Sequence, residues 1–355
     1  MAIIITLYQQ AFMSSNNINQ ILSRNIDILS AEAPLFINIK YDDFTQIYLN
    51  KYPKSELSCY NTNFEDYCAY KQNKRIQRYF SSQYLSEKKH DLVIIAFPKS
   101  KAELNFTLSM ITHAVSQNTK IIVVGENKSG IKSLIKVTEK TLLNCQKVDS
   151  ARHCSLYVAL LIPNESQFKL DDWYDYYAVD INNTQINVAA LPGVFSQKGL
   201  DKGTRVLLHH LPTIKSGELL DFGCGAGVIA SFIAKKHPEV TLNLLDVNAL
   251  AIQSARKTLE LNHLTGNVFA SNSLSELQNK YDVVISNPPF HQGTQTDYSA
   301  TESFLKGIKA HLKSSGNVII VANSFLKYEP IMKKTIGQTT RLHSQNGFTI
   351  YQSRI

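Results

Sequence analysis

The stretch DFGCGAG (Asp221–Gly227) decides the expected fold of the second half of this 355-residue chain. It follows the apolar run GELL (217–220) and leads into a segment of helical character. Glycine is needed where a backbone turns tightly and lets a ligand approach, and a helix N-terminus offers free N–H groups. A strand, a turn with Gly223, Gly225 and Gly227, and a helix predict a Rossmann-like βα unit that binds a ligand. The alternative is a glycine-rich turn with no ligand.

The spacing of the glycines narrows the kind of ligand. It is G-x-G-x-G, whereas dinucleotide-binding folds use G-x-G-x-x-G, so an NAD-dependent dehydrogenase is disfavoured. Asp246 ends the next predicted strand (241–245), 19 residues after Gly227. A carboxylate there can accept hydrogen bonds from both hydroxyls of a ribose, although it can also cap the following helix.

A second motif, NPPF (287–290), follows the predicted strand 281–286. Proline cannot continue a central strand, so the chain must leave the sheet at its carboxyl edge, where ligands bind in open α/β sheets. The Asn287 side-chain oxygen and the Pro288 carbonyl are two acceptors that can hold a planar NH2 group. Phe290 offers a ring face to a flat base. A plain Asn-Pro turn is the alternative, and we do not expect His291 to act as a general base.

Strands and helices also alternate elsewhere, which predicts a mostly parallel α/β sheet in each half. The length suggests two domains, and the polar composition of 166–192 predicts their boundary. We expect a domain at 1–180, a linker at 181–190 and a second domain at 191–355. Further predicted strands are 34–39, 91–97, 120–124, 155–161, 267–270, 317–322 and 348–352, and further predicted helices are 102–117, 247–262 and 302–312.

Composition excludes several classes of protein. The hydrophobic share is 44% and the charged share 19%, and no apolar run approaches the roughly 18–20 residues that span a bilayer. The N-terminal stretch is a poor signal peptide, so we expect a cytoplasmic protein. The five cysteines form no C-x-x-C pair, which predicts reduced thiols and no metal site.

The net charge of +8 favours an acidic partner. Basic residues interleaved with Tyr70, Tyr79, Phe80 and Tyr84 suit a nucleic-acid surface, although a solvated helix face is the alternative. The basic cluster consists of Lys71, Lys74, Arg75, Arg78, Lys88 and Lys89.

These motifs together resemble those of class I S-adenosylmethionine-dependent methyltransferases that modify exocyclic or amide nitrogens. The chain resembles one family more closely, the ribosomal RNA small subunit methyltransferase C family. The segments that carry this resemblance are LPGVFSQKGLDKGTRVLL (191–208), FASNS (269–273), ISNPPFHQG (285–293), VAN (321–323), VVGENKSGIKS (123–133) and KVDSARHCSLY (147–157).

The resemblance implies two tandem Rossmann-like class I methyltransferase domains. The N-terminal domain is the degenerate copy, since residues 1–180 contain no D-x-G-x-G turn and Phe97-Pro98-Lys99 stands where NPPF is expected. The implied activity is methyl transfer from S-adenosylmethionine to N2 of a guanine in 16S rRNA. The implied substrate is the assembled small subunit, and we expect a monomer.

The resemblance also implies the roles of site residues. The catalytic residues would be Asn287, Pro288 and Phe290. The cofactor-binding residues would be Asp221, Gly223, Gly225, Gly227, Asp246, Asn272, Ser273, Phe195, Ser196 and Thr204. Three alternatives stay open: a large-subunit guanine-N2 methyltransferase, an adenine-N6 or glutamine-N5 methyltransferase, and a non-catalytic RNA-binding assembly factor.

Overall fold

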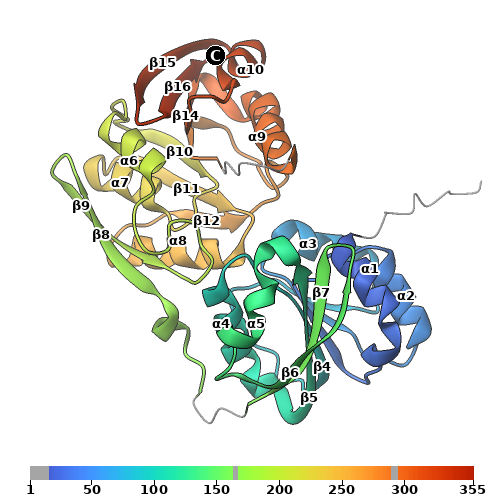
Figure 1. Cartoon of the computed structure of the whole chain (residues 1–355). Coiled ribbons are helices and arrows are strands. Elements are labelled where there is room, and N and C mark those ends of the chain that lie inside the picture. The colour runs from blue at the N-terminus through green and yellow to red at the C-terminus, as the bar shows by residue number, and fades with distance from the viewer. Residues whose placement is uncertain (1–15, 163–166, 289–294) are drawn as a thin grey trace, which may run out of the picture. The chain divides into compact units, whose positions relative to one another are not determined.

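The computed structural model describes residues 16–162, 167–288 and 295–355. Contacts divide the chain into two units. The first unit holds the described residues up to 61, with 66–79 and 84–168, and the second holds 62–65, 80–83 and 169–355. Each unit is built around one seven-stranded sheet (Figure 1).

The strands of the first unit are β1 (Pro34–Ile37), β2 (Ser58–Tyr60), β3 (Gln77–Tyr79), β4 (His90–Ala96), β5 (Val115–Glu126), β6 (Leu142–Ala151) and β7 (Cys154–Leu161). Its α-helices are α1 (Asn17–Arg24), α2 (Asp43–Lys51), α3 (Phe64–Ala69), α4 (Lys101–Met110) and α5 (Leu134–Val137). Residues 64 and 65 of α3 group with the second unit.

The sheet of the second unit contains β10 (Gly217–Phe222), β11 (Val240–Asp246), β12 (Asn267–Ala270), β13 (Tyr281–Ser286), β14 (Leu312–Asn323), β15 (Gln338–Gln345) and β16 (Phe348–Arg354). Its helices are α6 (Lys202–His209), α7 (Val228–Lys236), α8 (Ala249–Leu261), α9 (Gln295–Gly307) and α10 (Tyr328–Thr335). A separate hairpin is formed by β8 (Asp175–Ile181) and β9 (Thr184–Ala190).

The two sheets have the same topology. The orders are β3-β2-β1-β4-β5-β7-β6 and β12-β11-β10-β13-β14-β16-β15. The first five strands in each order are parallel, and the last two pair antiparallel. The predicted fold class, two Rossmann-like α/β domains, is confirmed.

Aromatic side chains fill the cores of both units. In the first unit the Phe36 ring lies 5.8 Å from Phe44 and 5.1 Å from Tyr48, all fully buried. In the second unit Phe222 stacks on buried Phe304 at 4.0 Å. This packing holds the central strands in place, so that their carboxyl ends are fixed positions for side chains.

The segment expected to be a linker, 181–190, is not one in the structure. Residues 184–190 form β9, and its backbone is bound to α8, since Ala189 N donates to Thr258 Oγ1 at 3.1 Å and Leu191 N to Ser254 Oγ at 3.0 Å. The last continuous stretch of the second unit begins earlier than expected, at residue 169. The alternating burial of 184–188 is the period of a half-buried strand, which the polar composition concealed.

Two predicted helices end earlier than expected. The segment 102–117 is helical only to Met110, and Val115 begins β5 after a 3-10 turn. The segment 302–312 belongs to α9 up to Gly307, and Leu312 begins β14. In both cases the apolar spacing runs on into the following strand, so periodicity alone does not reveal the boundary.

None of the helices in the described part of the chain combines the length and apolar character that a bilayer crossing requires. All five cysteines are free thiols. Within the described ranges, no group of three or more His, Cys, Asp or Glu side chains converges as metal ligands.

Candidate active site

The candidate site lies where the strand order reverses in the second unit. Strand β10 pairs with β11 on one side and β13 on the other, all parallel. Asp221 of β10 stands opposite Leu244 and Ile285 in the register. The glycine turn, the end of β11 and the NPPF motif therefore leave the sheet at neighbouring points of one edge, as a ligand crevice requires.

The turn after β10 has the backbone that only glycine adopts freely. The φ angles of Gly223, Gly225 and Gly227 are +70°, +53° and +75°. A Cβ at Gly223 or Gly225 would meet nothing within 4 Å, whereas one at Gly227 would lie 3.1 Å from the Ala255 Cα of α8. The first two glycines thus border open space, and the third lets α7 pack closely on α8.

Asp221 holds the first turn of α7. Its Oδ2 accepts a hydrogen bond from Ala230 N at 3.1 Å. The side chain is fully buried, and Oδ1 has no partner among the described residues. Burial raises the pKa of this carboxyl to about 7, with a smaller contribution from the charge of Asp246. A buried carboxylate oxygen without a partner at this edge could accept a hydrogen bond from a ligand.

Asp246 ends β11 and ties together the two neighbouring turns. Its Oδ2 accepts from Gly225 N at 3.0 Å and its Oδ1 from Asn248 N at 2.9 Å. Burial raises the pKa of the Asp246 carboxyl above its usual value, and these backbone donors oppose that shift. The helix α8 is capped separately by the Asn248 side chain, which accepts from Leu250 N. The carboxylate is therefore not needed as that cap.

The side chain of Asn287, in the NPPF motif, makes two hydrogen bonds through its NH2 group. Its Nδ2 donates to Asp201 Oδ2 at 3.0 Å and to Thr204 Oγ1 at 2.8 Å. Asn287 is half-buried and Pro288 is buried. The strand end beneath them is fixed because the Ser286 hydroxyl donates to the Phe222 carbonyl at 2.7 Å.

The remaining predicted site residues have mixed outcomes. Phe290 and His291 lie outside the described residues. Phe195 is 60% exposed, and Ser196 next to it has a φ of +60°. Asn272 is exposed and Ser273 half-buried just after β12. The hydroxyl of Thr204, which is predicted to contact the cofactor, accepts a hydrogen bond from Asn287 Nδ2.

Sequence reasoning missed Asp201. This residue is the N-cap of α6, where its Oδ2 accepts from Thr204 N at 3.0 Å. The Asp followed three residues later by Thr is a cap signal that was available in the segment 191–208. Its second partner, Asn287, is 86 residues away, and no local pattern indicates that contact.

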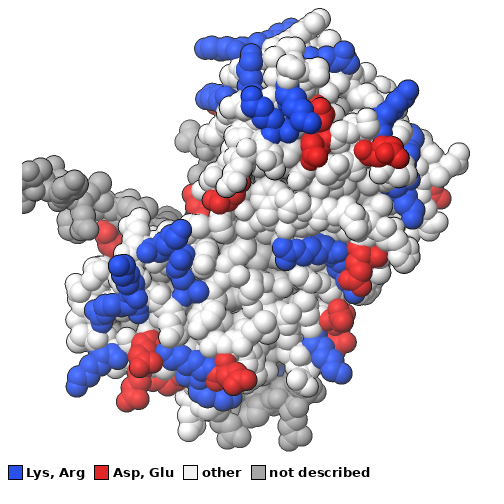
Figure 2. All heavy atoms as spheres, turned by 180° about the vertical axis from the view of Figure 1, so that it is seen from behind, with Lys and Arg blue, Asp and Glu red and all other residues white. Residues whose placement is uncertain are grey.

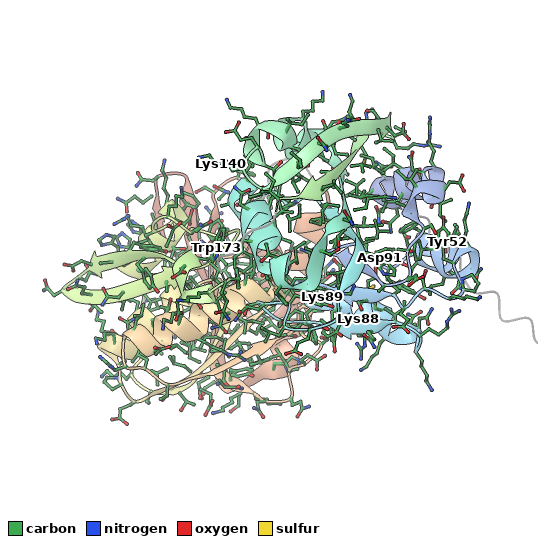
Figure 3. All side chains as sticks on the ribbon, turned by 90° about the horizontal axis from the view of Figure 1, so that it is seen from below. Tyr52, Lys88, Lys89, Asp91, Lys140 and Trp173 are labelled. Atoms are coloured by element: carbon green, nitrogen blue, oxygen red, sulfur yellow. The ribbon has the colours of Figure 1, made fainter. Side chains whose placement is uncertain are left out.

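Several side chains of the predicted basic cluster have partners within the first unit. Lys88 pairs with Glu56 at 2.9 Å, and Lys89 donates to the His113 carbonyl. Figure 3 labels both lysines beside the start of β4. The Arg78 guanidinium lies over the Tyr67 ring, 4.5 Å from its centre. Part of the charge is therefore used inside the first unit.

Comparison with known proteins identifies the class. The family model described as the methyltransferase small domain matches residues 185–352, and its N-terminal partner matches 19–177. The fold and the site thus define a two-domain methyltransferase of the methyltransferase small domain class.

Individual relatives narrow this to one family. The ribosomal RNA small subunit methyltransferase C of Colwellia psychrerythraea is 51% identical, over 97% of this chain and 99% of that protein. The protein of the same name from Aliivibrio salmonicida is 39% identical, over 96% and 100%. The chain belongs to the ribosomal RNA small subunit methyltransferase C family, as the sequence motifs predicted.

A solved structure agrees on the fold. The T. Thermophilus 16S rRNA N2 G1207 methyltransferase, in complex with AdoMet and guanosine, matches with a TM-score of 0.82. The match covers 96% of this chain and 92% of that one at 19% identity.

Proposed function

We propose that this protein transfers a methyl group from S-adenosylmethionine to the exocyclic N2 of a guanine in 16S rRNA. The substrate is the assembled small ribosomal subunit, and the protein acts as a monomer in the cytoplasm. The observation that carries the proposal is the orientation of the Asn287 side chain at the sheet edge. Its NH2 group is occupied by Asp201 and Thr204, which leaves its oxygen as the remaining acceptor of this side chain.

Two acceptors suit an amino group. An exocyclic NH2 carries two hydrogens in one plane, and each can be donated to one acceptor. Oδ1 of Asn287 and the carbonyl of Pro288 would hold them, with the nitrogen lone pair free to react. Positioning of this kind accounts for most of the rate in a transfer that needs no dedicated general base. Phe290 would stack on the flipped base.

The chain's residues fit S-adenosylmethionine. The open space at Gly223 and Gly225 accommodates a ligand against the backbone, and Asp246 is the acceptor suited to ribose hydroxyls. Gly227, Asp221, Phe195 and Ser196 would complete the methionine side. Asn272 and Ser273, just after β12, would flank the adenine. When bound, the cofactor supplies an electrophilic methyl group on a sulfonium.

The charge distribution supports an RNA partner. Figure 2 shows Lys and Arg side chains gathered over the end of the second unit that α10 and β15 form. Within that patch Lys333 and Arg341 both pair with Glu329, at 2.8 and 2.6 Å. In the first unit Lys71 and Lys74 are exposed cations. Phosphate contacts by such residues predict binding that weakens steeply with salt.

The test is methyl transfer from labelled S-adenosylmethionine to hypomethylated small subunits, large subunits and naked 16S rRNA in parallel. Nucleoside analysis then identifies the product. We expect N2-methylguanosine with small subunits alone. Label on large subunits would assign the protein to a different RNA, label on adenine would refute the base assignment, and no label with cofactor bound would refute catalysis on RNA.

A further inference from the structure

Both hydrogens of the Asn287 NH2 group have acceptors, and both acceptors lie on the first turn of α6. Asp201 Oδ2 is 3.0 Å and Thr204 Oγ1 is 2.8 Å from Asn287 Nδ2. A carboxylate only accepts hydrogen bonds, so the end of the amide that faces Asp201 must be the NH2 group. The opposite end, Oδ1, is then fixed as the end that faces away from this pair.

The acceptor pair is itself held rigidly. Asp201 Oδ2 also accepts from Thr204 N at 3.0 Å, and the Thr204 side chain is buried. A Cβ at Gly203, between them, would lie 3.1 Å from Asp201 Oδ2 and 3.0 Å from Phe348 Cε1. The turn of α6 that carries both acceptors is therefore packed closely against Phe348 of β16.

We propose that Asp201 and Thr204 are positioning residues that fix the direction of the Asn287 amide. An amide can rotate by half a turn and exchange its oxygen for its NH2 group at little cost unless its partners oppose it. In the exchanged orientation Asn287 would present donors to a substrate amino group, and no hydrogen bond would form. With the carboxylate in place, the site presents an acceptor and so selects an amino group over a carbonyl oxygen.

This inference rests on the proposed function, in which Asn287 Oδ1 receives the amino group. The competing explanation is that Asp201 serves only as the cap of α6. A capping role concerns the Thr204 backbone N–H, whereas positioning concerns the Thr204 hydroxyl and the Asn287 amide. The two roles therefore separate in variants that keep the cap.

The first unit provides a matched control. Asp42 is the N-cap of α2, where it accepts from Phe44 N at 2.9 Å. It also accepts from the side-chain Nδ2 of Asn16 at 3.2 Å. Asp42→Asn is thus the same substitution at a helix cap that also accepts a hydrogen bond from an asparagine amide. Asp42 has no proposed part in the reaction.

The experiment compares Asp201→Asn, Thr204→Val, the double variant and Asp42→Asn. Asparagine caps helices as well as aspartate does, so α6 keeps its cap in Asp201→Asn. Because an amide can accept or donate, the substituted side chain would no longer dictate which end of Asn287 faces it. We expect kcat to fall about 10-fold in each single variant, and by less than the product of the two effects in the double variant, because both residues act on one amide. KM for the RNA and the cofactor Kd should stay within about two-fold.

A second measurement does not depend on the substrate. The side-chain NH2 resonances of Asn287, assigned by their loss in Asn287→Ala, report hydrogen exchange with solvent. We expect slow exchange in the wild type and faster exchange in Asp201→Asn and Thr204→Val, with no change in Asp42→Asn.

The inference is overturned if the single variants keep wild-type kcat, or if the NH2 exchange is unchanged in them. A loss of kcat accompanied by an equal loss of cofactor affinity would also overturn it, because that result indicates general damage to the site. Failure of the wild type to modify guanine N2 would instead refute the proposed function, and the exchange measurement would still decide the inference.

Discussion

The two units of this protein share one strand order and differ at the carboxyl edge of their central strands. In the second unit β10 ends in a glycine turn with open space beside Gly223 and Gly225. In the first unit β1 is followed by Asn38, with φ of +55°, and by Ile39, which is 1% exposed. The chain after β1 thus enters the core at the place where the chain after β10 borders open space.

The strands next to β10 and β1, which are β11 and β2, also end in different residues. Strand β11 ends in the carboxylate of Asp246, whereas β2 is followed by Asn61, a buried amide. Asn61 Nδ2 donates to the Ile39 carbonyl at 3.3 Å, and Tyr70 Oη donates to the same oxygen at 2.9 Å. In the first unit, side chains therefore supply the hydrogen-bond donors to the backbone carbonyl that follows β1.

The comparison teaches that the sheet alone does not make a methyltransferase site. The strand order reverses in both sheets, yet among the described residues the glycines, the carboxylate and the asparagine stand together only in the second unit. Function depends on a few residues placed at strand ends of a shared fold. Matched variants at the strand ends of the two units test whether these residues account for the difference.

The largest effect is expected from Asn287→Ala. It removes the acceptor for the substrate amino group, and we expect kcat to fall about 1,000-fold, while the cofactor Kd changes by less than about two-fold. The measurements are single-turnover methyl transfer and calorimetric titration of the cofactor. Phe97, which follows β4 as Asn287 follows β13, is the control: Phe97→Leu should leave kcat unchanged. Loss of cofactor affinity with normal turnover in Asn287→Ala would contradict the assigned role.

Asp246→Asn should act on cofactor affinity instead. An asparagine has one acceptor oxygen, so it could not serve Gly225 N, Asn248 N and the two proposed ribose hydroxyls as the carboxylate would. We expect the Kd to rise about 10- to 100-fold, as for the loss of charge-assisted hydrogen bonds. Asn61→Ala is the matched change in the first unit, and calorimetry should give it a wild-type Kd. An equal rise in Kd in both variants would mean that the contrast between the strand ends is wrong.

A smaller effect is expected from Gly225→Ala. Its φ of +53° is strained for alanine by about 1–2 kcal/mol, and the added methyl group enters the open space beside the turn. Gly130→Ala in the first unit is the control. Gly130 has a φ of +92°, and a Cβ there would also meet nothing within 4 Å, so this change introduces the backbone strain outside the glycine turn of the second unit. We expect both to lower Tm by a few degrees, and only Gly225→Ala to raise the cofactor Kd, about 10-fold. A wild-type Kd for Gly225→Ala would show that no ligand approaches this glycine.

The sequence predicts the parts of this contrast that a short segment encodes, and it does not predict the parts that depend on contacts between distant residues. The glycine turn, Asp246 and Asn287 each stand at the end of an apolar run, so strand and site residue were predicted together. The hairpin β8–β9 was missed because its exposed face is polar and its buried face packs on α8, which is distant in the chain. The contact of Asp201 with Asn287 was missed for the same reason: it spans 86 residues and depends on where α6 packs.

The last prediction concerns the buried carboxyl of Asp221 at the end of β10 in the second unit. Ile37 of β1 pairs with Ile95 as Asp221 of β10 pairs with Ile285, so the first unit has an apolar side chain at the corresponding register position. Burial raises the pKa of Asp221 to about 7, against about 3.9 in an unfolded chain. Between these values the folded state binds the proton more tightly, so the contribution of Asp221 to stability falls as pH rises from about 4 to about 7.

Asp221→Asn removes this titration but keeps an oxygen that can accept from Ala230 N. The Tm difference between variant and wild type should therefore shift in favour of the variant by about 2–4 °C for each kcal/mol of penalty as pH rises from 5 to 8. Asp180→Asn removes a carboxylate from an exposed position on β8, and its Tm should follow the wild type at every pH. Thermal unfolding followed by circular dichroism at four pH values makes the comparison. Parallel profiles for Asp221→Asn and the wild type would mean that Asp221 is ionised at no cost, and that the polar edge of the second unit imposes no penalty on its stability.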